Sequence, residues 1–205
     1  FIITQFKFSG YIIIFSIYLG LFALAAILSF FMKRRPAKGN YFFVRILKER
    51  KINRDWNMVT NANFFQGLRE GIFAFVINVY VYIATGSEMT LGTFAFINSF
   101  VSFITYYLAS RFIKKKHRKK AILFGGILLF LSIFLIIFHV STPLFFLYSA
   151  VIAFSYPLVL VPFLSTVYDV IGQAWKAGEM RIEYVVVREL FLNLGRIFSI
   201  FLFLI

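Results

Sequence analysis

The stretch "NANFFQGLREGIFAFVINVYVYIATG", residues 61–86, decides the fold because it has the length of a membrane helix yet carries two adjacent charges, Arg69 and Glu70. If these charges marked the membrane surface, the apolar part would cover only residues 71–85, or about 22 Å of helix. A bilayer's hydrocarbon core is roughly 30 Å thick. If the helix begins near Val59 instead, Glu70 lies about 16 Å along it, close to the midplane. We therefore interpret both charges as lying inside a membrane-spanning helix.

The composition of the whole chain supports this interpretation. Hydrophobic residues make up 61% of its 205 residues, including 30 Phe, whereas a soluble domain is about half apolar at most. The alternating polarity of a membrane barrel is missing, so we predict an all-α, polytopic helical membrane bundle. Its expected spans are residues 11–32, 59–85, 90–112, 121–139, 143–167 and 184–205.

The positive charge of the chain, formally +14, falls in alternate connections between these spans. Most of the 22 Lys and Arg residues lie between the first and second spans, between the third and fourth, and between the fifth and sixth, whereas "TGSEM" and "HVSTP" hold none. The positive-inside rule then predicts a multi-pass protein of the cell (cytoplasmic) membrane with its basic loops in the cytoplasm. The run "RFIKKKHRKK" has no interleaved aromatic residues, so we favour a topology anchor over an RNA site and expect no nucleic-acid partner.

Residues 33–58 form the longest polar connection, and within it "ILKERKINRDW" is expected to lie as a short amphipathic helix on the inner surface. Trp56 and Tyr41 would then join the aromatic belt at the lipid–water interface. The chain does not begin with Met and both ends lie near apolar runs, so we expect a piece of a longer protein.

Polar residues share one face of each of two predicted spans. At about 100° per residue, one face of the second span carries Asn63, Gln66, Glu70 and Asn78, with Arg69 beyond its edge, and one face of the last span carries Arg188, Glu189, Asn193 and Arg196. Charges within a bilayer usually pair or face a wet cavity. Two alternatives stay open: the clusters are ion pairs that only join helices, or the segment up to Arg196 lies in the interface.

The chain offers little for covalent or metal chemistry. It contains no Cys, and we find no Gly-rich phosphate loop, His/Asp cluster or metal-spaced ligand set. We therefore expect no enzyme activity, no catalytic residue, no metal and no cofactor.

The strings "FFQGLREGIFAF", "YPLVLVPFLSTVYDVIG" and "RIEYVVVRELFLNLGR" resemble a bacterial branch of uncharacterised permeases in the major facilitator superfamily. The resemblance covers helices six to eleven of twelve, although "ASRFIKKKHRKK" keeps only the basic character of that family's loop motif. It implies three parts: residues 1–32 as the last helix of an N-terminal bundle, 33–58 as a cytoplasmic linker, and 59–205 as a C-terminal bundle without its final helix. The remaining helices of the same transporter would be partners.

The expected function is a secondary active transporter that moves a small solute by alternating access and is coupled to protons. Glu70, and after it Glu189, are the proton-coupling candidates, because burial and a neighbouring Arg shift a carboxyl's proton affinity in opposite directions. The substrate-cavity candidates are Gln66, Arg69, Asn78, Asn98, Arg188, Asn193 and Arg196. Partners would be the lipid bilayer, the solute and protons. The alternatives are a non-transporting membrane scaffold or sensor, a lipid flippase and, more remotely, a membrane enzyme.

Overall fold

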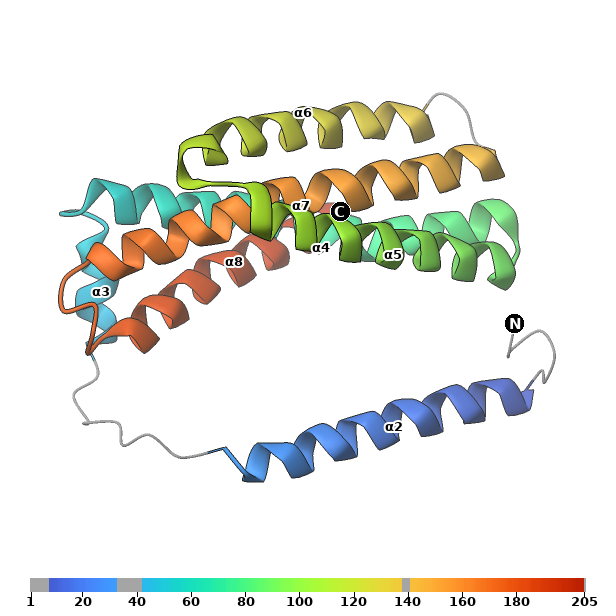
Figure 1. Ribbon diagram of the computed structural model, residues 1–205, viewed down its shortest axis with the longest axis horizontal. Helices are drawn as coiled ribbons and strands as arrows, with labels where there is room; N and C mark the ends of the chain where they lie inside the picture. The colour runs from blue at the N-terminus through green and yellow to red at the C-terminus, as the bar shows by residue number, and fades with distance from the viewer. Residues whose placement is uncertain (1–7, 33–41, 138–140, 205) are drawn as a thin grey trace. The chain divides into compact units, whose positions relative to one another are not determined.

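The computed structural model describes residues 8–32, 42–137 and 141–204, and these are helical with short connections and no strand. The chain divides into two units, Phe1–Asn40 and Tyr41–Ile205. Within the described part of the first unit there is one helix, α2 (Phe8–Phe30), which is mostly apolar and carries no charged residue (Figure 1). The prediction of an all-α protein is therefore confirmed for these ranges.

The second unit contains the other described helices. They are α3 (Phe43–Glu49), α4 (Arg54–Thr85), α5 (Glu88–Phe112), the short 3-10 helix η1 (Lys115–His117), α6 (Arg118–Ile137), α7 (Thr142–Gln173) and α8 (Arg181–Leu204). Successive long helices run in opposite directions (Figure 1). The basic connections α3–α4, α5–α6 and α7–α8 therefore lie at one end of the unit.

Within the described residues, each of the six apolar segments of the sequence falls mainly in one long helix, but not every helix has the composition of a membrane span. Among the described residues, three stretches are long and apolar enough to cross a bilayer: Gly10–Phe30, Glu88–Phe112 and Thr142–Gln173. By contrast, α4 and α8 carry internal charges, and α6 begins with three basic residues. The length and composition of the described helices therefore support three candidate membrane spans, and the six predicted spans are not established.

The turn between α4 and α5 is fixed by local chemistry. Gly86 ends α4 in the left-handed conformation with φ 60°, and its N–H donates to the Tyr82 carbonyl. Ser87 then caps α5, because its side-chain oxygen accepts from the N–H of Thr90. A glycine that ends one helix, followed directly by a serine that caps the next, produces a tight antiparallel helical hairpin.

Helices α4 and α8 cross at glycines that leave no room for a side chain. A Cβ at Gly67 would overlap the Leu192 carbonyl, and one at Gly195 would overlap the Phe64 carbonyl. A Cβ at Gly71, one turn beyond Gly67, would overlap the side chain of Ser199 of α8. Small residues four apart on both helices let the two backbones approach closely, as membrane helices do where no hydrophobic force drives association.

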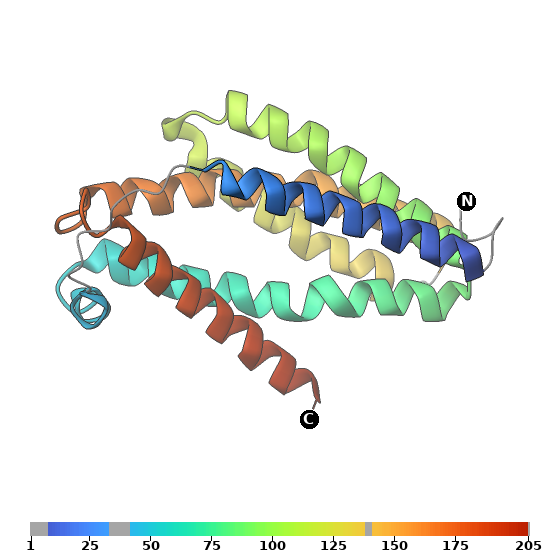
Figure 2. The same cartoon turned by 90° about the horizontal axis from the view of Figure 1, so that it is seen from below.

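Helix α7 packs against α5 on one side and α6 on the other (Figures 1 and 2). Pro157 and Pro162 lie inside α7 without ending it. Pro157 has no N–H for the carbonyl of Ala153, and that carbonyl instead accepts from the Ser102 hydroxyl of α5 at 3.4 Å. A second hydroxyl, on the buried Ser149, donates to the Phe94 carbonyl at 2.9 Å. The Ser102 hydrogen bond therefore replaces the one that Pro157 removes, whereas the Ser149 bond joins α7 to α5 independently of the prolines.

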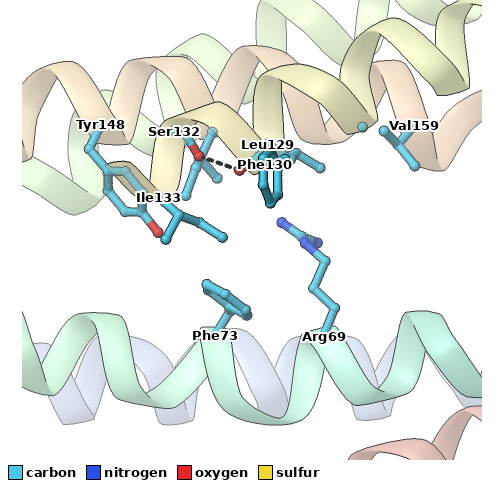
Figure 3. A pocket seen from close by; sticks show the side chains of 10 residues that line it. Arg69, Phe73, Leu129, Phe130, Ser132, Ile133, Tyr148 and Val159 are labelled. Atoms are coloured by element: carbon cyan, nitrogen blue, oxygen red, sulfur yellow. Dashed lines mark hydrogen bonds between the residues drawn. The ribbon is translucent and has the colours of Figure 1, made fainter. Parts of the chain in front are cut away.

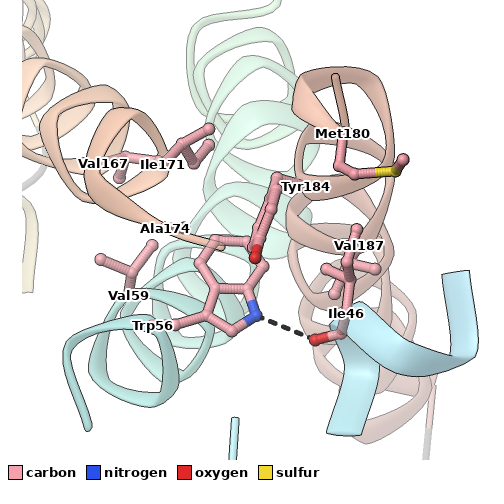
Figure 4. Close-up of a cluster of buried hydrophobic side chains, with 9 residues drawn as sticks. All are labelled: Ile46, Trp56, Val59, Val167, Ile171, Ala174, Met180, Tyr184 and Val187. Carbon is pink, nitrogen blue, oxygen red and sulfur yellow. Dashed lines mark hydrogen bonds between the residues drawn. The ribbon is translucent and has the colours of Figure 1, made fainter. Parts of the chain in front are cut away.

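Two apolar clusters connect the α4–α8 pair with the α5–α6–α7 group at opposite ends of the unit. The basic-end cluster consists of Ile46, Trp56, Val59, Val167, Ile171, Ala174, Met180, Tyr184 and Val187 (Figure 4). The opposite cluster consists of Val81, Phe94, Phe145 and Tyr148. The helices are thus joined by apolar contacts at both ends, and the polar residues of α4 lie between them.

Trp56 differs from its predicted place in an interfacial aromatic belt. It is fully buried, its ring lies 4.9 Å from that of Tyr184, and its Nε1–H donates to the Ile46 carbonyl at 3.2 Å (Figure 4). Tyr41 and residues 33–40 lie outside the described residues. The rest of the predicted linker forms α3 and the beginning of α4, and α3 packs on α8.

The glycine crossing generates a stability prediction. Gly67→Ala or Gly195→Ala should lower the free energy of unfolding by about 1–3 kcal/mol, because the added methyl group overlaps backbone atoms of the facing helix. Thermal unfolding of the purified protein in detergent measures this. The control is Gly92→Ala in α5, where an added Cβ meets nothing within 4 Å. Equal midpoints for all three variants would show that the crossing is not tightly packed.

Candidate functional site

The polar residues of α4 and α8 meet because they lie beside the glycines of the crossing. Gln66 and Glu70 flank Gly67 and Gly71 in the sequence of α4, and Arg196 follows Gly195 in α8. A close backbone approach brings such neighbours within hydrogen-bonding distance across the interface. The sequence placed these groups on the two polar faces, and the crossing brings the faces together.

Glu70 is the centre of a network from three helices. Its Oε2 accepts from Arg196 of α8, at 2.6 Å from Nη2 and 3.2 Å from Nε. Its Oε1 accepts from the Tyr156 hydroxyl of α7 at 2.7 Å and from Gln66 Nε2 at 2.9 Å. Only 17% of the Glu70 side chain is exposed. Asn193 extends the network, since its Oδ1 accepts from Arg196 Nη1 at 3.1 Å.

Arg188 and Glu189 form a separate cluster nearer the basic end. The buried Arg188 donates from Nε to the Asn63 Oδ1 at 3.0 Å, and its Nη2 lies 3.3 Å from Glu189 Oε1. Glu189 is 43% exposed, and its ion pair is with its sequence neighbour. The structure therefore gives the two candidate carboxylates different environments, and of the two it is Glu70 that bridges helices.

A cavity of about 880 Å³ lies beside Glu70. Its wall comes from α4, α5, α7 and α8 and is mostly aromatic and aliphatic. The polar and charged residues in its wall are Arg69, Glu70, Asn98, Ser99, Tyr106, Tyr148, Tyr156 and Arg196. Phe94 and Tyr148 of the opposite cluster belong to this wall, whereas the residues of the basic-end cluster lie beyond it.

Arg69 lies in the wall of this cavity and of a second one, of about 310 Å³, between α4, α6 and α7. Its guanidinium lies over the ring of Tyr156 at 4.5 Å, with the Phe73 ring at 6.0 Å. Figure 3 shows the side chain leaving α4 toward Leu129 and Phe130 of α6. In the part of the chain that the structure describes, Arg69 makes no hydrogen bond and no ion pair.

The predicted site residues thus fall into three groups. The cavity wall includes Arg69, Glu70, Asn98 and Arg196. Gln66 and Asn193 do not line the cavity but hydrogen-bond to Glu70 and Arg196, respectively. Arg188 and Glu189 form their own cluster. The side chain of Asn78 lies outside the described residues. Within the described ranges, no three His, Cys, Asp or Glu side chains gather as metal ligands.

Tyr156 and Tyr106 are site residues that the sequence analysis missed. A tyrosine in an apolar span is unremarkable as a residue type, since it also serves in aromatic belts. The available signal was position: Tyr156 lies in the middle of α7, directly before Pro157, where a hydroxyl needs a partner within the protein.

Comparison with known proteins finds a relative of unknown activity. The chain is 56% identical over 197 residues to the uncharacterized protein YqgE of Bacillus subtilis (strain 168). The match covers 96% of this chain and 46% of the relative, so the chain spans about half the length of that protein. No family model matches the chain, and no solved structure matches it.

The resemblance to the major facilitator superfamily is therefore wrong. The relative with which the chain shares more than half of its residues is uncharacterized, and neither a family model nor a solved structure connects the chain to that superfamily. The three strings misled because glycines and polar residues spaced along apolar helices follow from helix packing in membranes generally. The assignment to helices six to eleven falls with the resemblance.

The network generates a prediction about coupling between helices. Arg196→Leu should lower the free energy of unfolding by about 1–3 kcal/mol, because it leaves Glu70 without its charged partner. The double variant Glu70→Gln/Arg196→Leu should lose clearly less than the sum of the two single variants. Thermal unfolding in detergent at neutral pH measures all three.

The matched control is the exposed pair of Lys176 and Glu179, whose atoms lie 3.9 Å apart. Glutamine at either or both positions should give additive effects near zero, since exposed pairs contribute little. Additive effects for Glu70 and Arg196 as well would contradict the pairing.

Proposed function

We propose that the protein is a secondary active transporter that moves a small solute across the cell membrane by alternating access, with Glu70 as the proton carrier. In this proposal α2 and α4 to α8 are six membrane spans, and the basic connections lie in the cytoplasm. The observation that carries it is the Glu70 carboxylate, which is held by groups of α7 and α8 at the wall of an 880 Å³ cavity.

The charges of α4 and α8 support a membrane location for these helices. Charged residues inside a bilayer are costly unless they pair or face a cavity. Glu70 pairs with Arg196, Arg188 pairs with Asn63 and Glu189, and Arg69 faces a cavity. In the last two turns of α8, Ile197, Phe201 and Leu204 are exposed and would contact lipid.

The distribution of basic residues supports the orientation. The described connections at one end carry a dense set of Lys and Arg, whereas the α4–α5 turn carries none. Basic loops are retained on the cytoplasmic side during insertion. Lys115 and Arg118 also pair with Asp169 at the end of α7, at 3.2 and 2.7 Å, which ties the α5–α6 connection to the same end.

The arrangement of the two apolar clusters supports alternating access. Phe94 and Tyr148 of the opposite cluster line the cavity, whereas no residue of the basic-end cluster does, and each cluster joins α4 to α7. Apolar contacts can separate and re-form without leaving charges unpaired. Opening one cluster while the other stays closed would expose the cavity to one side of the membrane at a time.

The proton role of Glu70 predicts a specific transport defect. In the full-length protein reconstituted in vesicles, Glu70→Gln should abolish solute accumulation driven by a proton gradient, because the amide cannot load or release a proton. Exchange of internal for external solute should persist, since it needs no net proton movement. The matched control, Glu183→Gln at the start of α8, should accumulate normally.

Glu189→Gln separates the two carboxylate candidates in the same assay. Loss of accumulation in Glu189→Gln with normal accumulation in Glu70→Gln would transfer the proton role to Glu189. Normal accumulation in both variants would contradict proton coupling through either residue.

Alternating access predicts a labelling pattern for single cysteines, which the Cys-free chain allows. Asn98→Cys in the cavity wall should react with a membrane-impermeant thiol reagent both from outside in cells and from inside in inverted vesicles. Lys116→Cys should react from inside only, and Leu123→Cys on the exposed face of α6 from neither side. Protection of Asn98→Cys from both sides would favour a scaffold or sensor instead.

A further inference from the structure

The three arginines on the polar sides of α4 and α8 differ in their hydrogen-bond and ion-pair partners. Arg196 donates to the Glu70 carboxylate, and Arg188 donates to Asn63 and pairs with Glu189. Arg69 has no such partner among the described residues and contacts two aromatic rings. A guanidinium carries five N–H donors in a rigid fork. The ring contacts hold its position and leave these donors unused.

The charges in the walls of the two cavities do not balance. The described lining residues contain two cations, Arg69 and Arg196, and one anion, Glu70. With Glu70 ionised, the lining therefore carries one net positive charge. An unbalanced cation in a low-dielectric setting attracts an anion strongly. The larger cavity has room for one, since ligand pockets typically measure about 300–1,000 Å³.

We propose that Arg69 binds the carboxylate of an organic monoanion whose apolar body occupies the larger cavity. This inference rests on the proposed function and names the solute's class. The guanidinium fork matches a carboxylate, and one negative charge neutralises the lining, whereas a phosphate dianion exceeds it. Phe73, Phe94 and Ile152 supply an apolar wall for the body, and Asn98 and Ser99 supply polar contacts opposite α4.

Binding of the anion and of the proton then favour each other. The groups that face Glu70 are Arg196 on α8, Tyr156 on α7, Tyr106 on α5, and Gln66 and Arg69 on α4. Protonation of Glu70 raises the charge of the lining from one to two positive charges. The monoanion therefore binds more tightly as the pH falls, and by linkage the bound anion favours the protonated carboxyl. This is the coupling that proton–anion cotransport requires.

The test uses three probes of the same shape and different charge: 3-phenylpropionate, 3-phenylpropanol and 3-phenylpropylamine. Their binding to the full-length protein in nanodiscs of uncharged lipid is measured by thermal stabilisation, with inorganic phosphate at pH 8 as the dianion. We expect 3-phenylpropionate to raise the unfolding midpoint at concentrations where the other three do not. Its affinity should increase as the pH is lowered, and Glu70→Gln should keep the preference for the anion but lose the pH dependence.

Arg69→Gln should weaken 3-phenylpropionate binding roughly ten- to hundredfold, as expected for loss of charge-assisted hydrogen bonds. Arg69→Lys keeps the charge without the fork and should retain an intermediate affinity. The matched control is Arg54→Gln, an exposed arginine of the same helix about 22 Å away. The unfolding midpoint of each variant without ligand reports whether it folds.

The inference is overturned if the three probes bind alike, if none stabilises the protein, or if Arg69→Gln binds 3-phenylpropionate as the wild type does. Its failure is distinguishable from that of the proposed function. Accumulation of an uncharged or cationic solute that depends on Glu70 would keep the transporter and remove the anion. Anion binding that depends on Arg69, without accumulation in vesicles, would keep the anion site and remove the transporter.

Discussion

The close crossing of α4 and α8 is the constraint on which the site depends. Gly67, Gly71 and Gly195 leave no space for a Cβ, so the two backbones approach until their polar faces meet. Where helices lie in lipid, as proposed for α4 and α8, no hydrophobic force acts between them, and close van der Waals packing with interhelical hydrogen bonds takes its place. The same glycines therefore determine both the packing of the helices and the distance between Glu70 and Arg196. The polar face of α4 contacts the polar face of α8 because the glycines let the two backbones lie close together.

The second unit combines this tightly packed pair with a three-helix group around α7. The two parts contact each other through apolar clusters at the ends, and Glu70 and Tyr156 connect them across the middle. Apolar clusters are non-directional and tolerate sliding or separation, whereas a hydrogen bond of 2.7 Å between a hydroxyl and a carboxylate depends on geometry. A change in the protonation of Glu70 therefore acts directly on the contact between the two parts. In the proposed transporter, this contact would link a proton to a rearrangement of helices.

The sequence predicted the helices and the polar faces of α4 and α8, because the period of a helix is visible in residue spacing. It also indicated Glu70 by its depth in the span. It did not predict that Tyr156 would contact Glu70, since such a contact depends on which helices are neighbours, and neighbours are not visible in local spacing. Trp56 was misplaced for a related reason: an aromatic residue near a span's end suits a lipid interface and also suits a core formed by α3 and α8. The family resemblance failed because its strings reflect packing common to many membrane proteins.

The cavity is what distinguishes transport from a merely structural role for the charges. Joining α4, α7 and α8 requires only Glu70, Arg196, Gln66 and Tyr156, which hydrogen-bond to one another. Such a role leaves the five donors of Arg69 unused by the described residues, and it gives no reason for an 880 Å³ space with Asn98 and Ser99 in its wall. Arg69 is partly exposed and has no counter-charge among the described residues, so it contributes little to a purely structural site. A site that receives an anion for part of its cycle and is empty for the rest accounts for the same arginine, because a permanent partner within the protein would compete with the cargo.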